Sequence, residues 1–115
     1  MKSTSDVMVD YLRVFDTRDP ISMAALYGKK AFVIWGDRIW RGRDEIASFY
    51  NEIFDRVLPP DTKFDDNTYD AIVEEIAYVV WSGSSSLGQI KSGVDTFVVR
   101  NGEIKSLTVY IERDF

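Results

Sequence analysis

The apolar residues of this 115-residue chain recur with helical spacing in its first half and mainly with strand spacing in its second half. Within residues 5–16 an apolar side chain returns every three or four positions, which predicts an amphipathic helix. These side chains are Val7, Met8, Tyr11, Leu12 and Phe15. Asp19-Pro20 then supplies a helix N-cap followed by proline at the first helical position. This pair predicts a short helix over 21–27 that ends at Gly28.

A longer helix is predicted over 43–58, after a strand at 31–35, a turn at Gly36-Asp37 and an extended piece that ends at Gly42. Its apolar positions follow the i, i+3, i+4, i+7 rule over three turns. Two consecutive prolines follow this helix and end it, because a proline ring does not permit the helix to continue. We expect four of its residues to pack against other protein atoms, namely Ile46, Phe49, Ile53 and Phe54.

The remainder of the chain is predicted to form β-strands over 62–73, 76–83, 90–100 and 103–112. Asn101-Gly102 predicts a type I′ hairpin turn between the last two strands, because both central positions of that turn need positive φ.

One carboxylate stands out in these strands. Side chains alternate along a strand, so Asp95 shares its face with Phe97 and Val99. A carboxylate on an otherwise apolar face is the best lead to function in this sequence.

Composition and charge narrow the class of protein. A chain of this length, with 45% hydrophobic and 29% charged residues, is expected to form one domain over 1–115. A net charge of −5 argues against nucleic-acid binding, and the cluster Arg38, Arg41 and Arg43 is interpreted mainly as a solvated turn. No apolar run is long enough to span a membrane, and MKSTSDVMVD lacks the core of a signal peptide. We therefore expect a cytoplasmic protein.

The missing residue types limit the chemistry further. The sequence contains no cysteine and no histidine. This excludes disulfides, thiol nucleophiles and Cys-ligated zinc, and it removes both the usual general base and the usual transition-metal ligand. Proton transfer would therefore depend on Asp, Glu, Tyr or Lys, and no metal or cofactor is predicted.

Helices followed by a run of long strands predict an α+β fold. A long amphipathic helix lying across a curved antiparallel or mixed sheet leaves a space in which small ligands are commonly held. Trp35 and Trp81 lie in apolar strand segments. Each of them either fills the core or lines this space.

The order of these elements resembles that of SnoaL-like, or NTF2-like, domains. The matching segments in the first half are Arg18-Asp19, Ala25-Leu26-Tyr27, the strand at 31–33 and the stretch from Gly42 to Phe49. In the second half they are VVWSG and GVDTFVVRNGEI. The resemblance covers nearly the whole chain and implies a cone in which N-terminal helices pack on a strongly curved sheet. It also implies a homodimer, because sheets of this family use one face for the cavity and the other for a partner. It does not imply one activity, since the fold hosts isomerases, cyclases, dehydratases, hydrolases and non-catalytic binders.

Within this superfamily the chain is similar to ketosteroid isomerase at two positions of its oxyanion hole. Aligning the first helix places the tyrosine of that hole at Tyr11, and aligning VDTFVV places its protonated aspartate at Asp95. The aspartate base of that enzyme falls on Trp35, which cannot accept a proton. The steroid-isomerase assignment therefore does not carry over.

Three interpretations of Asp95 stay open from the residues alone. It can be structural, bonded to backbone amides or paired with an arginine. It can be the general acid or base of an apolar pocket, with Tyr11 as a donor to oxygen, because burial raises a carboxyl pKa toward neutrality. Asp37 can instead serve as the base of an isomerase-like site. The predicted walls of the pocket are Trp35, Trp81, Phe97, Val79, Val109 and Phe54.

The sequence thus predicts a small-molecule-binding domain for a planar, largely apolar ligand. If it is an enzyme, we expect isomerase- or lyase-like proton transfer by Asp95. The alternative is a ligand-binding or dimerisation module that performs no chemistry.

Overall fold

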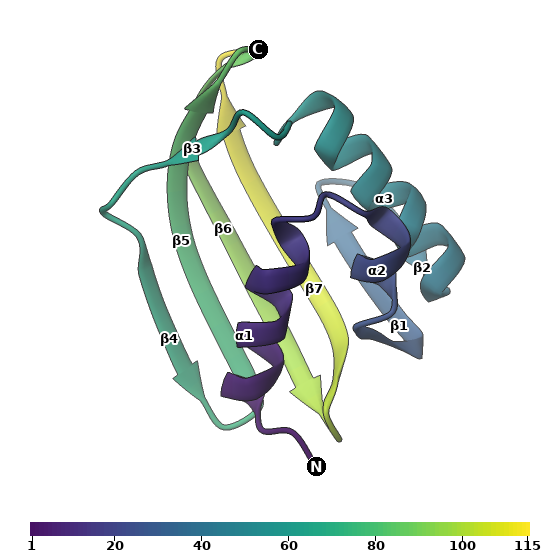
Figure 1. The fold of residues 1–115 in the computed structure, drawn as a ribbon. Helices are drawn as coiled ribbons and strands as arrows, with labels where there is room; N and C mark the ends of the chain where they lie inside the picture. Colours follow the sequence, from purple (N-terminus) through teal and green to yellow (C-terminus); the bar gives the residue numbers. More distant parts are fainter.

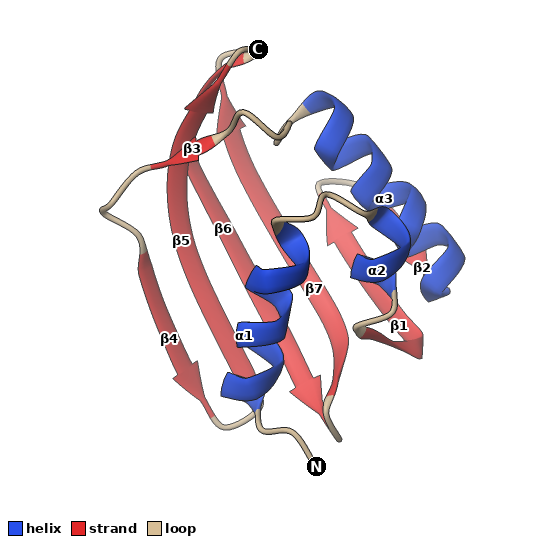
Figure 2. Cartoon of the chain, in the orientation of Figure 1, coloured by secondary structure: helices blue, strands red, loops and turns tan.

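Three helices cover the concave face of a curved seven-stranded sheet in the computed structural model, which describes residues 1–115 (Figures 1 and 2). The helices are α1 (Thr4–Phe15), α2 (Pro20–Ala24) and α3 (Gly42–Arg56). The strands are β1 (Tyr27–Trp35), β2 (Arg38–Arg41), β3 (Lys63–Phe64), β4 (Tyr69–Val73), β5 (Ile76–Ser85), β6 (Gly88–Arg100) and β7 (Glu103–Arg113). The predicted α+β architecture is confirmed.

The sheet is mixed, with the order β2-β1-β7-β6-β5-β3 and with β4 also paired to β5. Neighbouring strands are antiparallel except for β1 and β7, which run parallel. The chain passes from helix α2 into β1, which lies next to the edge strand β2. The long β5–β6–β7 meander forms the centre of the sheet (Figure 1). None of the helices has the length and apolar character needed to cross a membrane.

Helix α1 is held across the sheet by its caps and its apolar face. Ser3 forms a capping box with Asp6, which satisfies backbone donors at the start of the helix. The hydroxyl of Thr4 donates to the carbonyl of Glu74, and Arg18 donates to the carbonyl of Leu58 at 3.1 Å. Both ends of α1 are thus tied to distant parts of the chain, and the helix is fixed above the strands.

The apolar face of α3 is buried as predicted. Ile46, Phe49, Ile53 and Phe54 are at most 7% exposed. The type I′ turn is also confirmed, because Asn101 and Gly102 have φ angles of 54° and 73°. Local sequence pattern therefore predicts both the buried face of α3 and the hairpin that carries Asp95.

Two predicted boundaries are wrong. The second helix ends at Ala24 rather than at 27, because Tyr27 already belongs to β1 and pairs with Ile104 of β7. The predicted strand over 62–73 is divided into β3 and β4 by residues 65–68, Asp-Asp-Asn-Thr. These residue types favour turns, and the register of the partner strand β5 shifts opposite the gap, between Trp81 and Gly83.

Candidate functional site

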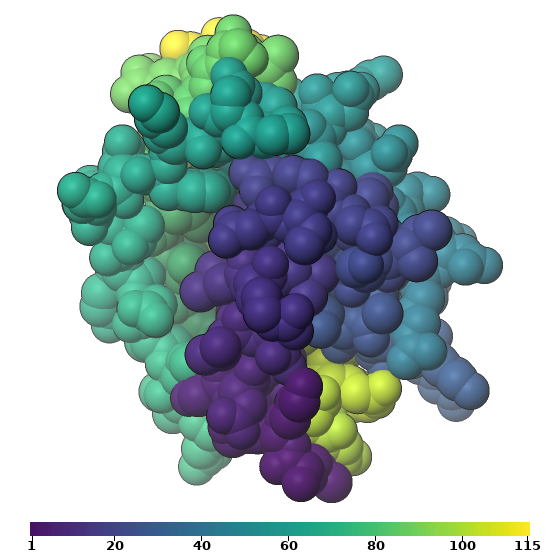
Figure 3. Space-filling view, viewed as in Figure 1, coloured from purple at the N-terminus to yellow at the C-terminus, as the bar shows by residue number.

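A cavity of about 460 Å³ lies between α1, α3 and the concave face of the sheet. This volume is typical of sites for small organic molecules. Its wall comprises 23 residues, of which 19 are hydrophobic. Leu12 of α1 and Ile72 of β4 line it and are 65% and 40% exposed, so the cavity opens between these two elements. Figure 3 shows the surface hollowed between α1 and β4.

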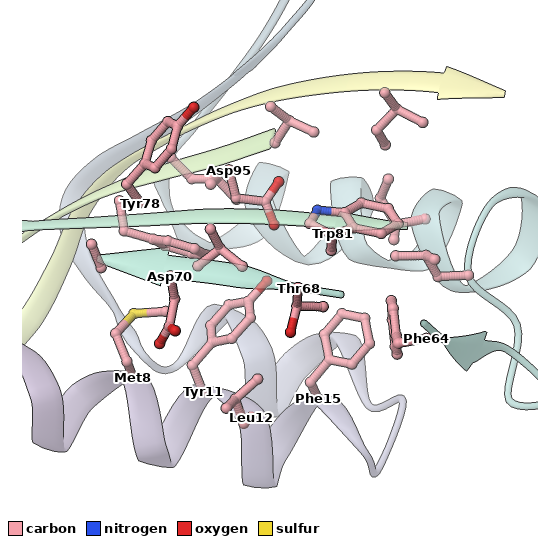
Figure 4. A pocket seen from close by; sticks show the side chains of 18 of the residues that line it. Met8, Tyr11, Leu12, Phe15, Phe64, Thr68, Asp70, Tyr78, Trp81 and Asp95 are labelled. Carbon is pink, nitrogen blue, oxygen red and sulfur yellow. The ribbon is translucent and has the colours of Figure 1, made fainter. Parts of the chain in front are cut away.

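Asp95 lies on the sheet wall of this cavity (Figure 4). Its direct cross-strand neighbours are Val79 on β5 and Val109 on β7, both of which also line the cavity. The residue keeps some accessible surface because it borders the cavity, but its carboxyl group lies deep in the molecule. Burial raises the pKa of the Asp95 carboxyl to about 7, and the nearby indole N–H of Trp81 acts in the opposite direction.

Trp81 places a second polar atom beside Asp95. The residue is only 7% exposed, and its Nε1–H has no partner that satisfies the distance and angle of a hydrogen bond. In Figure 4 this nitrogen is on the side of the ring toward the Asp95 carboxyl group. A buried donor without an acceptor costs stability, so its presence here points to a function in the cavity.

The orientation of Trp81 depends on a glycine in the next strand. Gly93 of β6 is its cross-strand partner, and a Cβ at this position would lie 2.0 Å from Cε2 of the indole. The ring therefore covers the bare backbone of Gly93, and any side chain there would displace it.

Three tyrosines form a buried hydrogen-bonded row on the opposite side of the cavity. The hydroxyl of Tyr50 is 3.0 Å from that of Tyr11 and 2.5 Å from that of Tyr27. All three residues are at most 7% exposed, and burial raises the pKa of each phenol well above its usual value. We refer to Tyr11, Tyr50 and Tyr27 as the tyrosine row.

Burial determines the direction in which this row donates. Tyr27 is completely buried and does not line the cavity, whereas Tyr11 and Tyr50 do. If Tyr11 donated to Tyr50 and Tyr50 donated to Tyr27, the proton of Tyr27 would have no acceptor, at a cost of about 1–3 kcal/mol. Donation from Tyr27 to Tyr50 avoids this cost. The outer end of the row, at Tyr50 and Tyr11, then has a hydroxyl proton available to an acceptor in the cavity.

The structure brings most of the predicted site residues together. Tyr11, Asp95, Trp81, Phe97, Val79 and Val109 all line the cavity. Tyr11 and Phe97 are in edge-to-face contact, with ring centroids 4.8 Å apart. Tyr11 makes no direct hydrogen bond to Asp95, since its hydroxyl contacts Tyr50 instead.

Three predicted residues lie outside the cavity wall. Trp35 shares the cross-strand row of Val109, but its ring packs on Trp40 and Phe49. Phe54 lies behind the wall, in contact with Phe15 and Tyr50. Asp37 is exposed in the turn between β1 and β2. These three residues therefore do not form part of the site that the structure describes.

Sequence reasoning missed two members of the tyrosine row, Tyr27 and Tyr50. Helical spacing puts Tyr50 on the apolar face of the helix predicted over 43–58, and Tyr27 ends the helix predicted over 21–27. Neither position indicates which hydroxyl the side chain meets. A hydroxyl on a face expected to be buried was the available signal, because such a group needs a partner. No cluster of three or more side chains of the kinds that ligate metals occurs in the structure.

Comparison with known proteins places the chain in a family. Residues 5–98 match the model of the SnoaL-like domain. The chain belongs to the SnoaL-like domain family. This confirms the resemblance found in the sequence, whereas no curated protein sequence matches the chain.

Solved structures share the fold of this SnoaL-like domain at low sequence identity. A protein from Sphaerobacter thermophilus is 20% identical with a TM-score of 0.77, and the match covers 99% of this chain and 100% of that one. An NTF2-like protein of unknown function from Mesorhizobium loti is 20% identical with a TM-score of 0.73, over 95% and 90% of the chains. A candidate ketosteroid isomerase from Kribbella flavida is 16% identical with a TM-score of 0.75, over 97% and 79%. At these identities the likeness establishes the fold alone.

Proposed function

We propose that this SnoaL-like domain binds planar, largely apolar small molecules and that Asp95 acts on them as a general acid–base. The observation that carries the proposal is the setting of Asp95. Its carboxyl group takes part in none of the ion pairs of the molecule and lies between two valines on the wall of an apolar cavity. A structural aspartate would have a cation or backbone donors around it.

The chemistry follows from the two polar sides of the cavity. A ketone is a suitable substrate, since its carbonyl oxygen can accept a hydrogen bond from the Tyr11 hydroxyl, which borders the cavity. The Asp95 carboxylate removes a proton from a carbon next to the carbonyl. The C–H electrons then form a C=C bond, and the carbonyl electrons move to the oxygen as an enolate. The carboxylic acid returns the proton to the same carbon or, where a neighbouring C=C bond makes the anion a dienolate, to the γ-carbon of that dienolate. A pKa of about 7 suits both steps at neutral pH, because both forms of Asp95 are populated.

A second candidate is ligand binding without chemistry. It is favoured by Trp35, which occupies the position of the catalytic base in ketosteroid isomerase and lies outside the cavity wall. Strand β1 therefore supplies no carboxylate to the cavity. In this case Tyr11, Asp95 and Trp81 hold an oxygen atom of the ligand and no proton leaves carbon.

Two measurements test the proposal and separate the candidates. Binding is followed through the emission of 2-naphthol, a planar phenol, with wild type and with Asp95→Asn. Catalysis is followed through deuterium exchange next to the carbonyl of 2-tetralone. We expect wild type to bind the naphthol and to accelerate exchange, and Asp95→Asn to bind without accelerating it. Binding with no acceleration by wild type would establish the second candidate. Absence of binding would contradict both.

Self-association is also a proposal, based on the outer face of the sheet. Val94, Thr96 and Val98 of β6 are partly exposed on this face, and Tyr110 of β7 is 57% exposed. A second copy is the partner expected from the sequence, and the homodimer stays a prediction. Sedimentation at micromolar concentration tests it, and a monomer alone would contradict it.

A further inference from the structure

The charged residues on the cavity wall all have the same sign. They are Asp16, Asp70 and Asp95, and none of the 14 lysines and arginines of the chain lines the cavity. The absence of histidine leaves no other cationic side chain. An anionic ligand would therefore enter a space that contains carboxylates and no compensating charge.

Two of these carboxylates lie toward solvent and lack an ion-pair partner. Neither Asp16 nor Asp70 takes part in any ion pair or side-chain hydrogen bond, whereas Asp10, Glu52, Glu75 and Glu103 all pair with lysine or arginine. Asp16 is partly compensated, because Arg18 lies within its electrostatic reach. Asp70 is the uncompensated carboxylate on β4, the strand that borders the mouth of the cavity.

The walls between the mouth and the sheet are rich in aromatic rings. Tyr11 and Phe15 of α1, Phe64 of β3 and Trp81 of β5 contribute their rings to this lining (Figure 4). The face of an aromatic ring attracts a cation, and a largely desolvated site strengthens this attraction. The lining thus combines carboxylates with the rings that favour organic cations.

A second, independent observation concerns the deep end of the cavity. The Nε1–H of Trp81 is buried beside Asp95 without a hydrogen-bond partner, and the hydroxyl of Tyr11 lines the same cavity. Both groups can donate to an acceptor oxygen of a ligand, such as a hydroxyl or carbonyl oxygen. The cavity therefore offers donors at its deep end and carboxylates at its mouth.

We infer that the ligand of this cavity is an organic amine that also carries an acceptor oxygen, with its ammonium group paired to Asp70 at the mouth. The inference rests on the proposed function and specifies the class of molecule that the same site takes. It excludes carboxylates, phosphates and sulfates as ligands.

Three phenols of similar size test this ligand class. They are 4-ethylphenol, tyramine and 3-(4-hydroxyphenyl)propionate, which share a ring and a hydroxyl but are neutral, cationic and anionic at pH 7.5. We expect tyramine to bind roughly tenfold more tightly than 4-ethylphenol by calorimetry, and the propionate to bind most weakly. The preference for tyramine should shrink as sodium chloride is raised, since salt screens charges near the surface.

Variants of the exposed carboxylates test whether Asp70 is the group that pairs with the ammonium group of the ligand. Asp70→Asn should remove most of the preference for tyramine and leave the affinity for 4-ethylphenol unchanged. Asp66→Asn is the matched control, because Asp66 lies in the same segment but does not line the cavity. A preference that survives Asp70→Asn unchanged would overturn the role of Asp70. Equal affinity of wild type for tyramine and 4-ethylphenol would overturn the inference while the proposed function stands. If none of the three binds, the proposed function fails as well.

Discussion

The two polar sides of the cavity differ in whether their buried polar groups have hydrogen-bond partners within the protein. In the tyrosine row, each buried hydroxyl contacts another, at 3.0 Å and 2.5 Å. Across the cavity, Trp81 and Asp95 place an indole N–H and a carboxyl group side by side; the N–H has no partner of good hydrogen-bond geometry, and the carboxyl group takes part in no ion pair. Every hydroxyl of the row has a protein partner, whereas the Nε1–H of Trp81 has none. Buried polar groups that stay unpaired mark the place where a ligand completes the structure.

The largest effect should come from the middle of the tyrosine row. Tyr50→Phe removes both hydrogen bonds and leaves the hydroxyl of Tyr27 sealed in the core. We expect the free energy of unfolding to fall by about 2–4 kcal/mol, measured by urea denaturation. Tyr11→Phe is the matched control and should cost less, because Tyr50 borders the cavity and can find water there. Equal costs for the two variants would contradict the direction assigned to the row.

A smaller effect is expected where the backbone positions Trp81. Gly93→Ala puts a methyl group where the indole lies, and overpacking of this kind costs about 1–3 kcal/mol. The cost should largely vanish when Trp81→Ala is already present, since the clash is then absent. A double-mutant cycle measures this coupling. Additive effects would show that Gly93 does not position the ring.

Substitution of Asp95 should change the free energy of unfolding in the opposite direction from substitution within the tyrosine row. Its pKa rises from 3.8 to about 7 on folding, so the native state binds more protons than the unfolded state between these pH values. The stability of wild type therefore falls as pH rises from about 4 to about 7 and then levels off.

Asp95→Asn has no carboxyl group to ionise and escapes this loss. We expect the variant to match wild type near pH 4 and to be more stable by up to about 4 kcal/mol at pH 8, since each unit of pKa shift corresponds to about 1.4 kcal/mol. Melting curves at both pH values provide the measurement. Destabilisation of the variant at pH 8 would mean that Asp95 has a structural role.

The sequence predicts the parts of the molecule that local pattern controls. The spacing of Ile46, Phe49, Ile53 and Phe54 identifies the buried face of α3, and Asn101-Gly102 identifies the hairpin. Strand alternation is enough to find Asp95. These features depend on neighbours a few residues away.

Contacts between distant residues escape the same reasoning. The tyrosine row links positions 23 and 39 residues apart, and nothing near Tyr50 indicates which hydroxyls it meets. The role of Gly93 depends on the pairing of β5 with β6, which places the indole of Trp81 over its backbone. The strand position of Trp35 predicts a place on the cavity wall, but its ring packs against Trp40 and Phe49 and therefore lies outside that wall.

The indole signals of the three tryptophans test the central claim most directly, which is that the Trp81–Asp95 pair receives the oxygen of a ligand. With ¹⁵N-labelled protein, Trp35 and Trp40 serve as internal controls, because neither lines the cavity. Addition of 4-ethylphenol should shift the Nε1–H resonance of Trp81 downfield, as a new hydrogen bond does, and leave the other two in place. Ethylbenzene, which lacks the oxygen, should not produce this shift. If both compounds move the Trp81 signal equally, or neither moves it, the pair does not bind the ligand oxygen and the account is wrong.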